Sequence, residues 1–290
     1  MTISVTHYSD PGCPWAYSAS PALAVLRWRF SDQLEWRLVM IGLAETGERY
    51  EKAGYTPAGS AKGRVAVFRR FGMPLTATPK RRVSGTSRGC RAVVATRLTA
   101  PERELDAFRA LQFMQFGTEG VLDDDDDLRD ALRWVDGLDT DAVVGAIDSP
   151  EVLEAYERDR AEARTAEGSA TEAMNRAATS DGPVRYTAPS LVFSRNGTTL
   201  DAGGFQPMES YDMAIANLDP TLRREPPPEN ALAALERFPS GLTTQEIAAI
   251  LCPHLAEPPR AMAEEQLIDL VAEGRATRTA LADDAVWKPS

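Results

Sequence analysis

Apolar and polar residues alternate over positions 2–8 of the chain. Ile3 and Val5 fall on one face of an extended segment and Ser4 falls on the other, which is the two-residue period of a β-strand. Farther on, apolar residues recur every three or four positions, as in helices packed on a core. For the first half, this pattern predicts a strand over 2–8, a helix over 15–30 that kinks or restarts at Pro21, a strand over 34–43, a short helix over 61–71 in otherwise irregular chain from 44 to 85, and helices over 87–98, 101–116 and 127–135.

The second half begins with more helix and then returns to strands. The pattern predicts helix from 139 to 165 with a restart at 149–151, a polar surface insert over 167–184, strands over 186–193 and 198–201 joined by an Asn196-Gly197 turn, and a helix over 207–218. The order is therefore strand, helix, strand, helical block, strand, hairpin strand and helix. This order indicates an α/β fold with a helical insertion over about 44–185.

The composition changes after Leu222. Residues 223–230 form a proline-rich stretch that predicts a stiff linker. Beyond it, a helix over 231–238, a Thr243/Glu246 capping box, an amphipathic helix over 264–273 and two short strands over 276–287 are expected. This is the outline of a small winged-helix-like domain over 231–290.

Charge and composition narrow the partners. The 290-residue chain has a net charge of −11, and residues 226–290 carry ten acidic against five basic side chains, so nucleic acid is not expected to bind. No apolar run is long enough for a membrane span, and the start lacks a secretory signal, so a cytoplasmic protein is expected. For the C-terminal domain we expect contacts in a homodimer, cover for an active site, or a protein partner. A redox-responsive regulator is a separate hypothesis.

Metal and disulfide chemistry have little support in the residue counts. The chain has two histidines and three widely spaced cysteines, which fit neither a disulfide framework nor a zinc site, so no metal is expected. The aspartates at 123–127 lack the ligand spacing of a calcium loop. We expect them at the start of a helix, where carboxylates favour the helix dipole.

Cys13 carries the candidate chemistry. It follows Asp10-Pro11-Gly12 and directly precedes the predicted first helix. The positive end of a helix and its free backbone N–H groups favour a thiolate, and Pro14 fits the first helical turn. We therefore expect a nucleophilic thiolate with a lowered pKa; the alternative is a buried, inert cysteine.

The sequence Cys13-Pro14-Trp15-Ala16-Tyr17, read with Ala188-Pro189 ahead of a later strand, resembles the DsbA-like branch of the thioredoxin superfamily. In that family a Cys-Pro-Trp-Cys or related motif opens the first helix, a helical block follows the second strand, and a cis-proline faces the motif. The resemblance covers about residues 2–218. The sequence is similar in particular to FrnE-like and mycothiol-dependent nitroreductase-like members, and more distantly to kappa glutathione transferases and hydroxychromene carboxylate isomerases. The resemblance implies a thioredoxin-like domain over residues 1–222.

The resemblance also assigns roles. Cys13 matches the attacking cysteine, and Pro189 matches the cis-proline, whose neighbour Ala188 would pair with an extended thiol ligand or peptide. Pro14, Trp15, Ala16 and Tyr17 fall in the substrate-binding or thiol-binding motif, with Trp15 and Tyr17 flanking the ligand cleft. Ala16 replaces the second cysteine, so a mixed disulfide cannot be resolved within the motif.

The resulting hypothesis is a monothiol oxidoreductase or thiol-dependent reductase. Mycothiol or glutathione would act as co-substrate on a disulfide or a small electrophile, with no tightly bound cofactor. The alternatives are a transferase or isomerase of the kappa type, in which Cys13 positions a bound thiol, and a non-catalytic binding module. Cys90, at the start of the 87–98 helix, is a candidate resolving thiol, although such a residue more often packs. Cys252 is expected to be structural, because Cys252 and His254 lie too close in sequence to form a catalytic pair.

Overall fold

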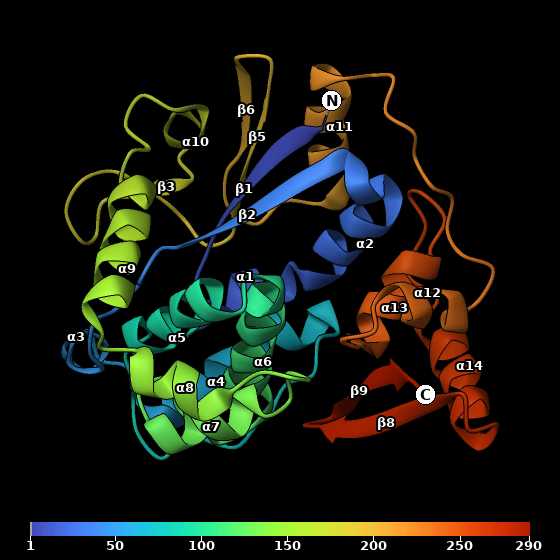
Figure 1. Cartoon of the computed structure of the whole chain (residues 1–290), viewed down its shortest axis with the longest axis horizontal. Coiled ribbons are helices and arrows are strands. Elements are labelled where there is room, and N and C mark those ends of the chain that lie inside the picture. Colours follow the sequence, from blue (N-terminus) through green and yellow to red (C-terminus); the bar gives the residue numbers. More distant parts are fainter. Residues whose placement is uncertain (1) are drawn as a thin grey trace.

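The computed structural model describes residues 2–290, and its strands form three sheets. The strands are β1 Ile3–Ser9, β2 Leu34–Met40, β3 Ala177–Ala178, β4 Arg185–Tyr186, β5 Ser190–Arg195, β6 Thr198–Ala202, β7 Leu242–Thr243, β8 Ala276–Leu281 and β9 Asp284–Pro289. The main sheet has the order β2-β1-β5-β6 (Figure 1). β1 pairs in parallel with β2 and antiparallel with β5, which in turn pairs antiparallel with β6.

Helices fill most of the remaining chain. They are α1 Pro14–Ser18, α2 Ser20–Phe30, α3 Glu48–Lys52, α4 Pro57–Phe68, α5 Ser87–Thr99, α6 Glu104–Gly117, α7 Asp125–Leu132, α8 Thr140–Ala146, α9 Pro150–Ala163, α10 Ala170–Ala173, α11 Met208–Leu218, α12 Ala231–Arg237, α13 Thr244–Leu251 and α14 Arg260–Ala272. Short 3-10 turns are Ser31–Gln33, Arg69–Phe71 and Pro101–Arg103. Within residues 2–290, no helix has both the length and the apolar character needed to cross a membrane.

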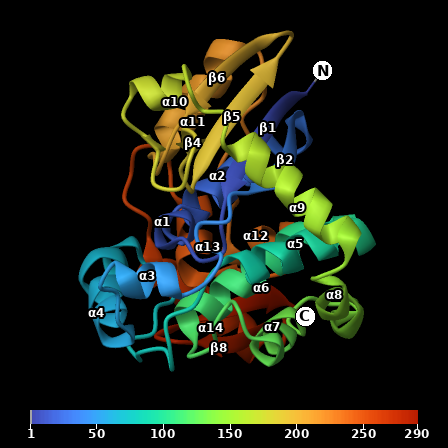
Figure 2. The same ribbon diagram turned by 90° about the vertical axis from the view of Figure 1, so that its left-hand side faces the viewer.

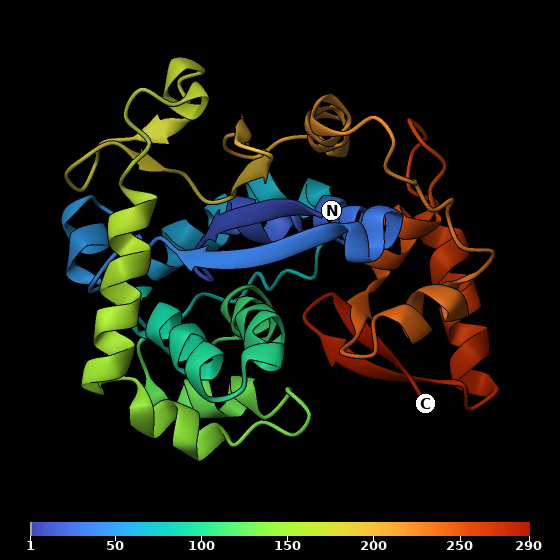
Figure 3. The same ribbon diagram turned by 45° about the horizontal axis from the view of Figure 1, so that its top comes forward.

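Two helices cover one part of the main sheet. Alternate residues of β1 and β5, among them Val5 and Phe193, pack on Leu26 of α2 and Ile215 of α11. The helical block of α5 to α9 packs around Leu38 and Met40 at the far end of β2 (Figure 3). This arrangement confirms the predicted α/β order with a helical block between the second strand and the strands that follow it.

The C-terminal elements pack directly on the rest of the chain. α12, α13 and α14 share one core with Ala24 and Val25 of α2, and the sheet of order β7-β9-β8 lies beside α6 and α7 (Figures 1 and 2). The capping box is present: Thr243 and Glu246 each bond the other's backbone, and Glu246 also pairs with Arg109 of α6 at 2.9 Å. Whether residues 231–290 form a separate winged-helix domain stays a prediction.

Several boundaries differ from the sequence prediction, each for a local reason. The first helix breaks at Ala19, two residues ahead of Pro21, which confirms the kink. The predicted strand over 186–193 is wrong as one element, because a cis Ala188–Pro189 peptide bond separates β4 from β5. The segment 167–184 is not purely irregular: it contains α10 and β3 and is held by Thr171, whose hydroxyl donates to Asp201.

The aspartate run begins a helix, as expected. Asp124 caps α7 by accepting from the backbone N–H groups of Asp126 and Asp127, and Asp125 pairs with Arg88. Asp123 accepts from the backbone of Gly85 at 2.9 Å. The carboxylates thus serve as helix cap and ion-pair partners. Residues 2–290 contain no group of three or more His, Cys, Asp or Glu side chains placed to hold a metal ion.

Candidate functional site

Cys13 is the N-cap residue of α1. Its extended backbone (φ −85°, ψ 116°) ends the β1 loop, and Pro14 occupies the first helical turn, where its missing N–H costs no helical hydrogen bond. The side chain is buried, with 6% of its surface exposed, among Tyr8, Val39 and Ala188. The sequence therefore places the sulfur at a helix start, and the fold encloses it in an apolar setting.

The cis-proline segment faces this cysteine. The Ala188–Pro189 bond is cis, and Cys13 Sγ donates to the Ala188 carbonyl oxygen at 3.0 Å. Chain segments 175 residues apart thus meet at the Cys13 sulfur, and the cis-proline segment faces the motif as the resemblance implied. A thiol that donates this bond carries its proton.

Asp10 organises the loop beneath Cys13 and was given no role by the sequence. Its buried carboxylate accepts from Gly12 N at 2.7 Å, Leu43 N at 2.8 Å and the Thr86 hydroxyl at 2.8 Å. A side chain at position 12 would collide with Thr86 and Asp10, so the loop needs glycine there. Aspartate before Pro-Gly is a turn signal that could have suggested this arrangement.

Electrostatics in this structure oppose the expected thiolate. The pKa of the Cys13 thiol is raised to about 12, chiefly by burial and in smaller part by the nearby Asp10 charge. The backbone N–H groups of Ala16 and Trp15 and the Arg185 guanidinium lower the pKa, but they do not offset desolvation. The prediction of a lowered pKa is therefore wrong for this state. Burial of the sulfur disfavours the thiolate more than the backbone N–H groups at the helix start favour it. Arg185, buried and paired with Asp181, had no signal in the sequence.

This raised pKa predicts slow alkylation of Cys13. Because the thiolate fraction grows tenfold per pH unit below the pKa, the iodoacetamide rate is expected to rise from pH 6 to 9.5 without a plateau and to stay below that of free cysteine at pH 7. Peptide mapping with mass spectrometry would follow Cys13 separately from Cys90 and Cys252. A plateau near neutral pH would contradict the buried, protonated state.

Asp10→Asn is expected to separate charge from structure in the loop. Removing the negative charge should lower the pKa of Cys13 and speed its alkylation at pH 8. The asparagine side chain also places an N–H donor against groups that themselves donate. One buried donor without an acceptor lowers the free energy of unfolding by about 1–3 kcal/mol. Urea unfolding measures the second effect. An unchanged alkylation rate in a folded variant would show that the Asp10 charge does not reach the sulfur.

A cleft of about 610 Å³ opens beside Cys13. Its neighbours Gly12, Pro14 and Trp15 form one wall, and residues of α3 and α4 contribute another. Figure 2 shows α3 and α4 beside α1. Trp15 is 37% exposed and contacts three aromatic rings, those of Phe68, Phe71 and Phe205. Further lining residues include Tyr50, Tyr55, Arg64, Lys80 and Arg82.

Ala16 and Tyr17 lie outside this cleft. Tyr17 is fully buried, stacks on Phe116 and donates to the Pro74 carbonyl at 2.8 Å. Its predicted place beside the ligand is therefore wrong, because the side chain points from α1 into the core shared with Leu281. Ala16 is also buried and lines a different cavity.

Cys90 and Cys252 are both free, like Cys13. Cys90 is wholly buried on α5, and its sulfur donates to Asp10 at 3.4 Å, so Asp10 contacts the Cys90 thiol and organises the Cys13 loop. Burial and the Asp10 charge raise the pKa of Cys90, which disfavours the thiolate that a resolving residue needs. Cys252 bonds the Ala256 carbonyl at the end of α13. A resolving role for Cys90 stays a prediction.

Solved structures with the same architecture can now be compared. A candidate protein disulfide isomerase from Nitrosomonas europaea has a TM-score of 0.58 at 16% identity, with 75% of this chain and 97% of that chain covered. A probable DsbA oxidoreductase from Streptomyces coelicolor has a TM-score of 0.55 at 18% identity, with 76% and 91% covered. The chain has the thioredoxin-like fold of DsbA-type proteins.

A third structure with the DsbA-like fold is the cytosolic disulfide reductase DsbM from Pseudomonas aeruginosa, with a TM-score of 0.50 at 16% identity and 74% and 99% of the two chains covered. These structures are matched over nearly their whole length, whereas about a quarter of this chain has no counterpart in them. Comparison with protein-family models gave no match, and comparison with curated protein sequences gave none either.

Proposed function

We propose that this protein is a thiol-disulfide oxidoreductase or thiol-dependent reductase that acts through Cys13 alone, with a low-molecular-weight thiol as co-substrate. The observation that carries the proposal is the hydrogen bond from Cys13 Sγ to Ala188 O at 3.0 Å, beside the cis-proline and at the edge of an open cleft. The DsbA-like fold supports it. Three free cysteines fit the reducing, cytoplasmic setting that we also propose.

The proposed reaction has two exchange steps. Cys13 gives its proton to solvent and attacks one sulfur of a disulfide, which forms a Cys13 mixed disulfide, breaks the S–S bond and releases the other sulfur as a thiolate that solvent reprotonates. An external thiol then attacks the mixed disulfide, restoring the Cys13 thiol and carrying away the bound half as a new disulfide. Ala16 supplies no sulfur, so the external thiol is required.

Ligand binding would have to activate Cys13, since burial raises its pKa. An extended ligand whose N–H donates to the Ala188 carbonyl would replace the Cys13 thiol as the donor to that oxygen. The helix N–H groups of Trp15 and Ala16 then remain as donors to a thiolate. The resting enzyme would therefore be protected from adventitious oxidation and become reactive with substrate in place.

The cleft favours a thiol that carries carboxylates. The Arg64 guanidinium is buried, and its pKa is lowered by burial with no carboxylate contributing to the shift. A glutathione carboxylate would supply the missing counter-charge, whereas mycothiol offers hydroxyl groups. We therefore place glutathione ahead of mycothiol as co-substrate.

The test is incubation with glutathione disulfide and with mycothiol disulfide, followed by intact-mass spectrometry. We expect one glutathione adduct, mapped to Cys13 and removed by excess glutathione, and less mycothiol adduct. No adduct at Cys13 with either disulfide would contradict the oxidoreductase proposal.

The raised pKa of Cys13 also favours a second candidate, a non-catalytic thioredoxin-like binding module. Such a module would bind a thiol ligand or peptide at Ala188 without forming a covalent adduct. Saturable binding of glutathione, with no Cys13 mixed disulfide after prolonged incubation with glutathione disulfide, would distinguish it from the enzyme.

A further inference from the structure

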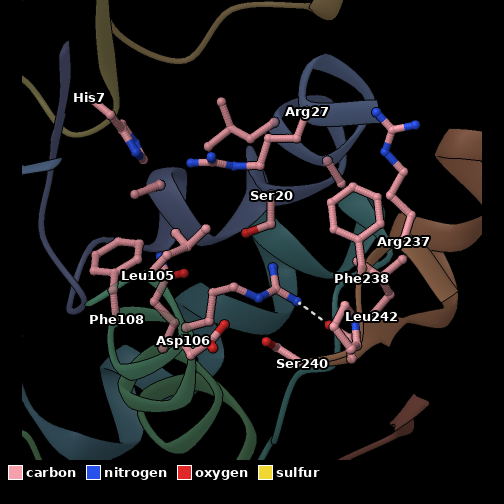
Figure 4. A pocket seen from close by; sticks show the side chains of 17 residues that line it. His7, Ser20, Arg27, Leu105, Asp106, Phe108, Arg237, Phe238, Ser240 and Leu242 are labelled. Atoms are coloured by element: carbon pink, nitrogen blue, oxygen red, sulfur yellow. Dashed lines mark hydrogen bonds between the residues drawn. The ribbon is translucent and has the colours of Figure 1, made fainter. Parts of the chain in front are cut away.

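A second cavity lies where α2 and α6 meet the C-terminal elements (Figure 4). Its volume is about 220 Å³, and it shares no lining residue with the cleft beside Cys13. One wall is Ala16 of α1, and another is the segment 237–242 that enters β7. The cavity is therefore formed only when the C-terminal elements pack against α2 and α6.

Two buried polar side chains in this cavity lack hydrogen-bond partners within the described residues. His7 and Gln112 are each 2% exposed, and both ring nitrogens of His7 and the Gln112 Nε2 donor are unpaired. The His7 ring projects into the open space in Figure 4. Because buried polar groups in folded proteins nearly always have a partner, these atoms call for a water or a ligand atom in the cavity.

The cavity also holds a positive charge without a counter-charge. Arg27 stacks on Trp36, with its guanidinium carbon 3.9 Å from the ring centre, and its guanidinium extends toward His7 (Figure 4). Burial and the neighbouring Arg109 charge lower the pKa of Arg27 to about 9, and no carboxylate contributes to the shift.

The other charged side chains that line the cavity interact with other residues. Arg109 pairs with Glu246, and Asp106, the acidic lining residue, lies 3.7 Å from Arg103. Arg237 packs over Trp28, and its guanidinium points away from the centre of the cavity in Figure 4. An anion beside Arg27 would therefore meet a free guanidinium edge and an attractive local field.

Apart from Ser20 and Ser240, the remaining lining is mostly apolar and sets the size of the ligand. Its apolar side chains include Leu23, Ala24, Leu105, Phe108, Phe238 and Leu242. A cavity of about 150 Å³ accepts benzene, so this one has room for a ring with a small substituent. We propose that the cavity binds a small monocarboxylate with an aromatic-sized apolar body, its carboxylate held by Arg27, His7 and Gln112.

Calorimetric titration of the full chain with three probes tests this assignment. Benzoate should bind saturably at one site, benzamide at least tenfold more weakly because it lacks the charge, and inorganic phosphate not at all. Benzamide binding as well as benzoate, phosphate binding more tightly, or no benzoate binding would each overturn the assignment.

Substitutions in the cavity lining test whether benzoate binds beside Arg27. Arg27→Gln should weaken benzoate binding at least tenfold, whereas the matched change Arg275→Gln, at an exposed arginine outside the cavity lining, should leave it unchanged. Ser240→Trp adds bulk at an exposed lining position, so it should weaken benzoate at least tenfold even if Arg27→Gln fails to fold. Full benzoate affinity in a folded Arg27→Gln variant, or in Ser240→Trp, would overturn the proposal. Cys13 chemistry is not involved, so the outcome is independent of the proposed function.

Discussion

Cys13→Ser is expected to abolish thiol-dependent turnover, with a loss of at least about a thousandfold. A serine hydroxyl keeps the donor to the Ala188 carbonyl and nearly the same volume, so the fold should be preserved. The pKa of a serine hydroxyl lies far above that of a thiol, however, and serine cannot form a disulfide. The measurement is reduction of glutathione mixed disulfides together with adduct formation by intact mass.

Cys252→Ser is the matched control, because Cys252 lies in the C-terminal part and bonds only nearby carbonyls. It should retain full turnover. Cys90→Ser tests the resolving hypothesis separately: adduct removal that slows in this variant would support a role for Cys90. Turnover that persists in Cys13→Ser would reject the single-thiol mechanism.

Ala16→Cys is expected to convert the site from one-thiol to two-thiol chemistry. Position 16 lies three residues after Cys13, and Cα atoms at this spacing in a helical turn are about 5 Å apart, within the range of about 4.4–6.8 Å that a disulfide spans. The introduced thiol should resolve a Cys13 adduct by internal attack, so the glutathione adduct should fall by on the order of tenfold. The oxidised protein should instead lose the mass of two hydrogens.

Ala16→Ser controls for the added bulk at this buried position, since it enlarges the side chain without a second sulfur. Its glutathione adduct should accumulate as in the unaltered chain. If Ala16→Cys still accumulates the adduct and forms no internal disulfide, Cys13 and position 16 are not positioned for exchange, and the absence of a second cysteine does not determine the proposed mechanism.

Local periodicity was sufficient to predict much of the architecture. The alternation of Ile3, Ser4 and Val5, the Asn196-Gly197 turn and the Thr243/Glu246 pair each act through neighbours in sequence, so their structural outcome could be predicted without the fold. The approach of Ala188 to Cys13 came from the family resemblance, because no local rule brings these residues together.

The wrong predictions concern properties set by distant contacts. The thiolate was inferred from the helix start, but the pKa of Cys13 depends on burial among Tyr8, Val39 and Ala188. Tyr17 was placed beside the ligand, but its direction depends on a core that includes Leu281 from the other end of the chain. Asp10 was visible as a turn residue, yet its partners Leu43 and Thr86 are defined only by the fold.

The hairpin of β8 and β9 has a mechanical consequence. Leu281 packs against Gly117 so closely that any larger residue there would collide with it, and Asp283 accepts from the Leu75 backbone at 2.8 Å. The core that fixes Tyr17, four residues after Cys13, is thus completed by residues of the β8–β9 hairpin. Residues 276–289 must therefore be in place before α1 acquires its final support, so a chain truncated ahead of β8 would present Cys13 on a loosened scaffold.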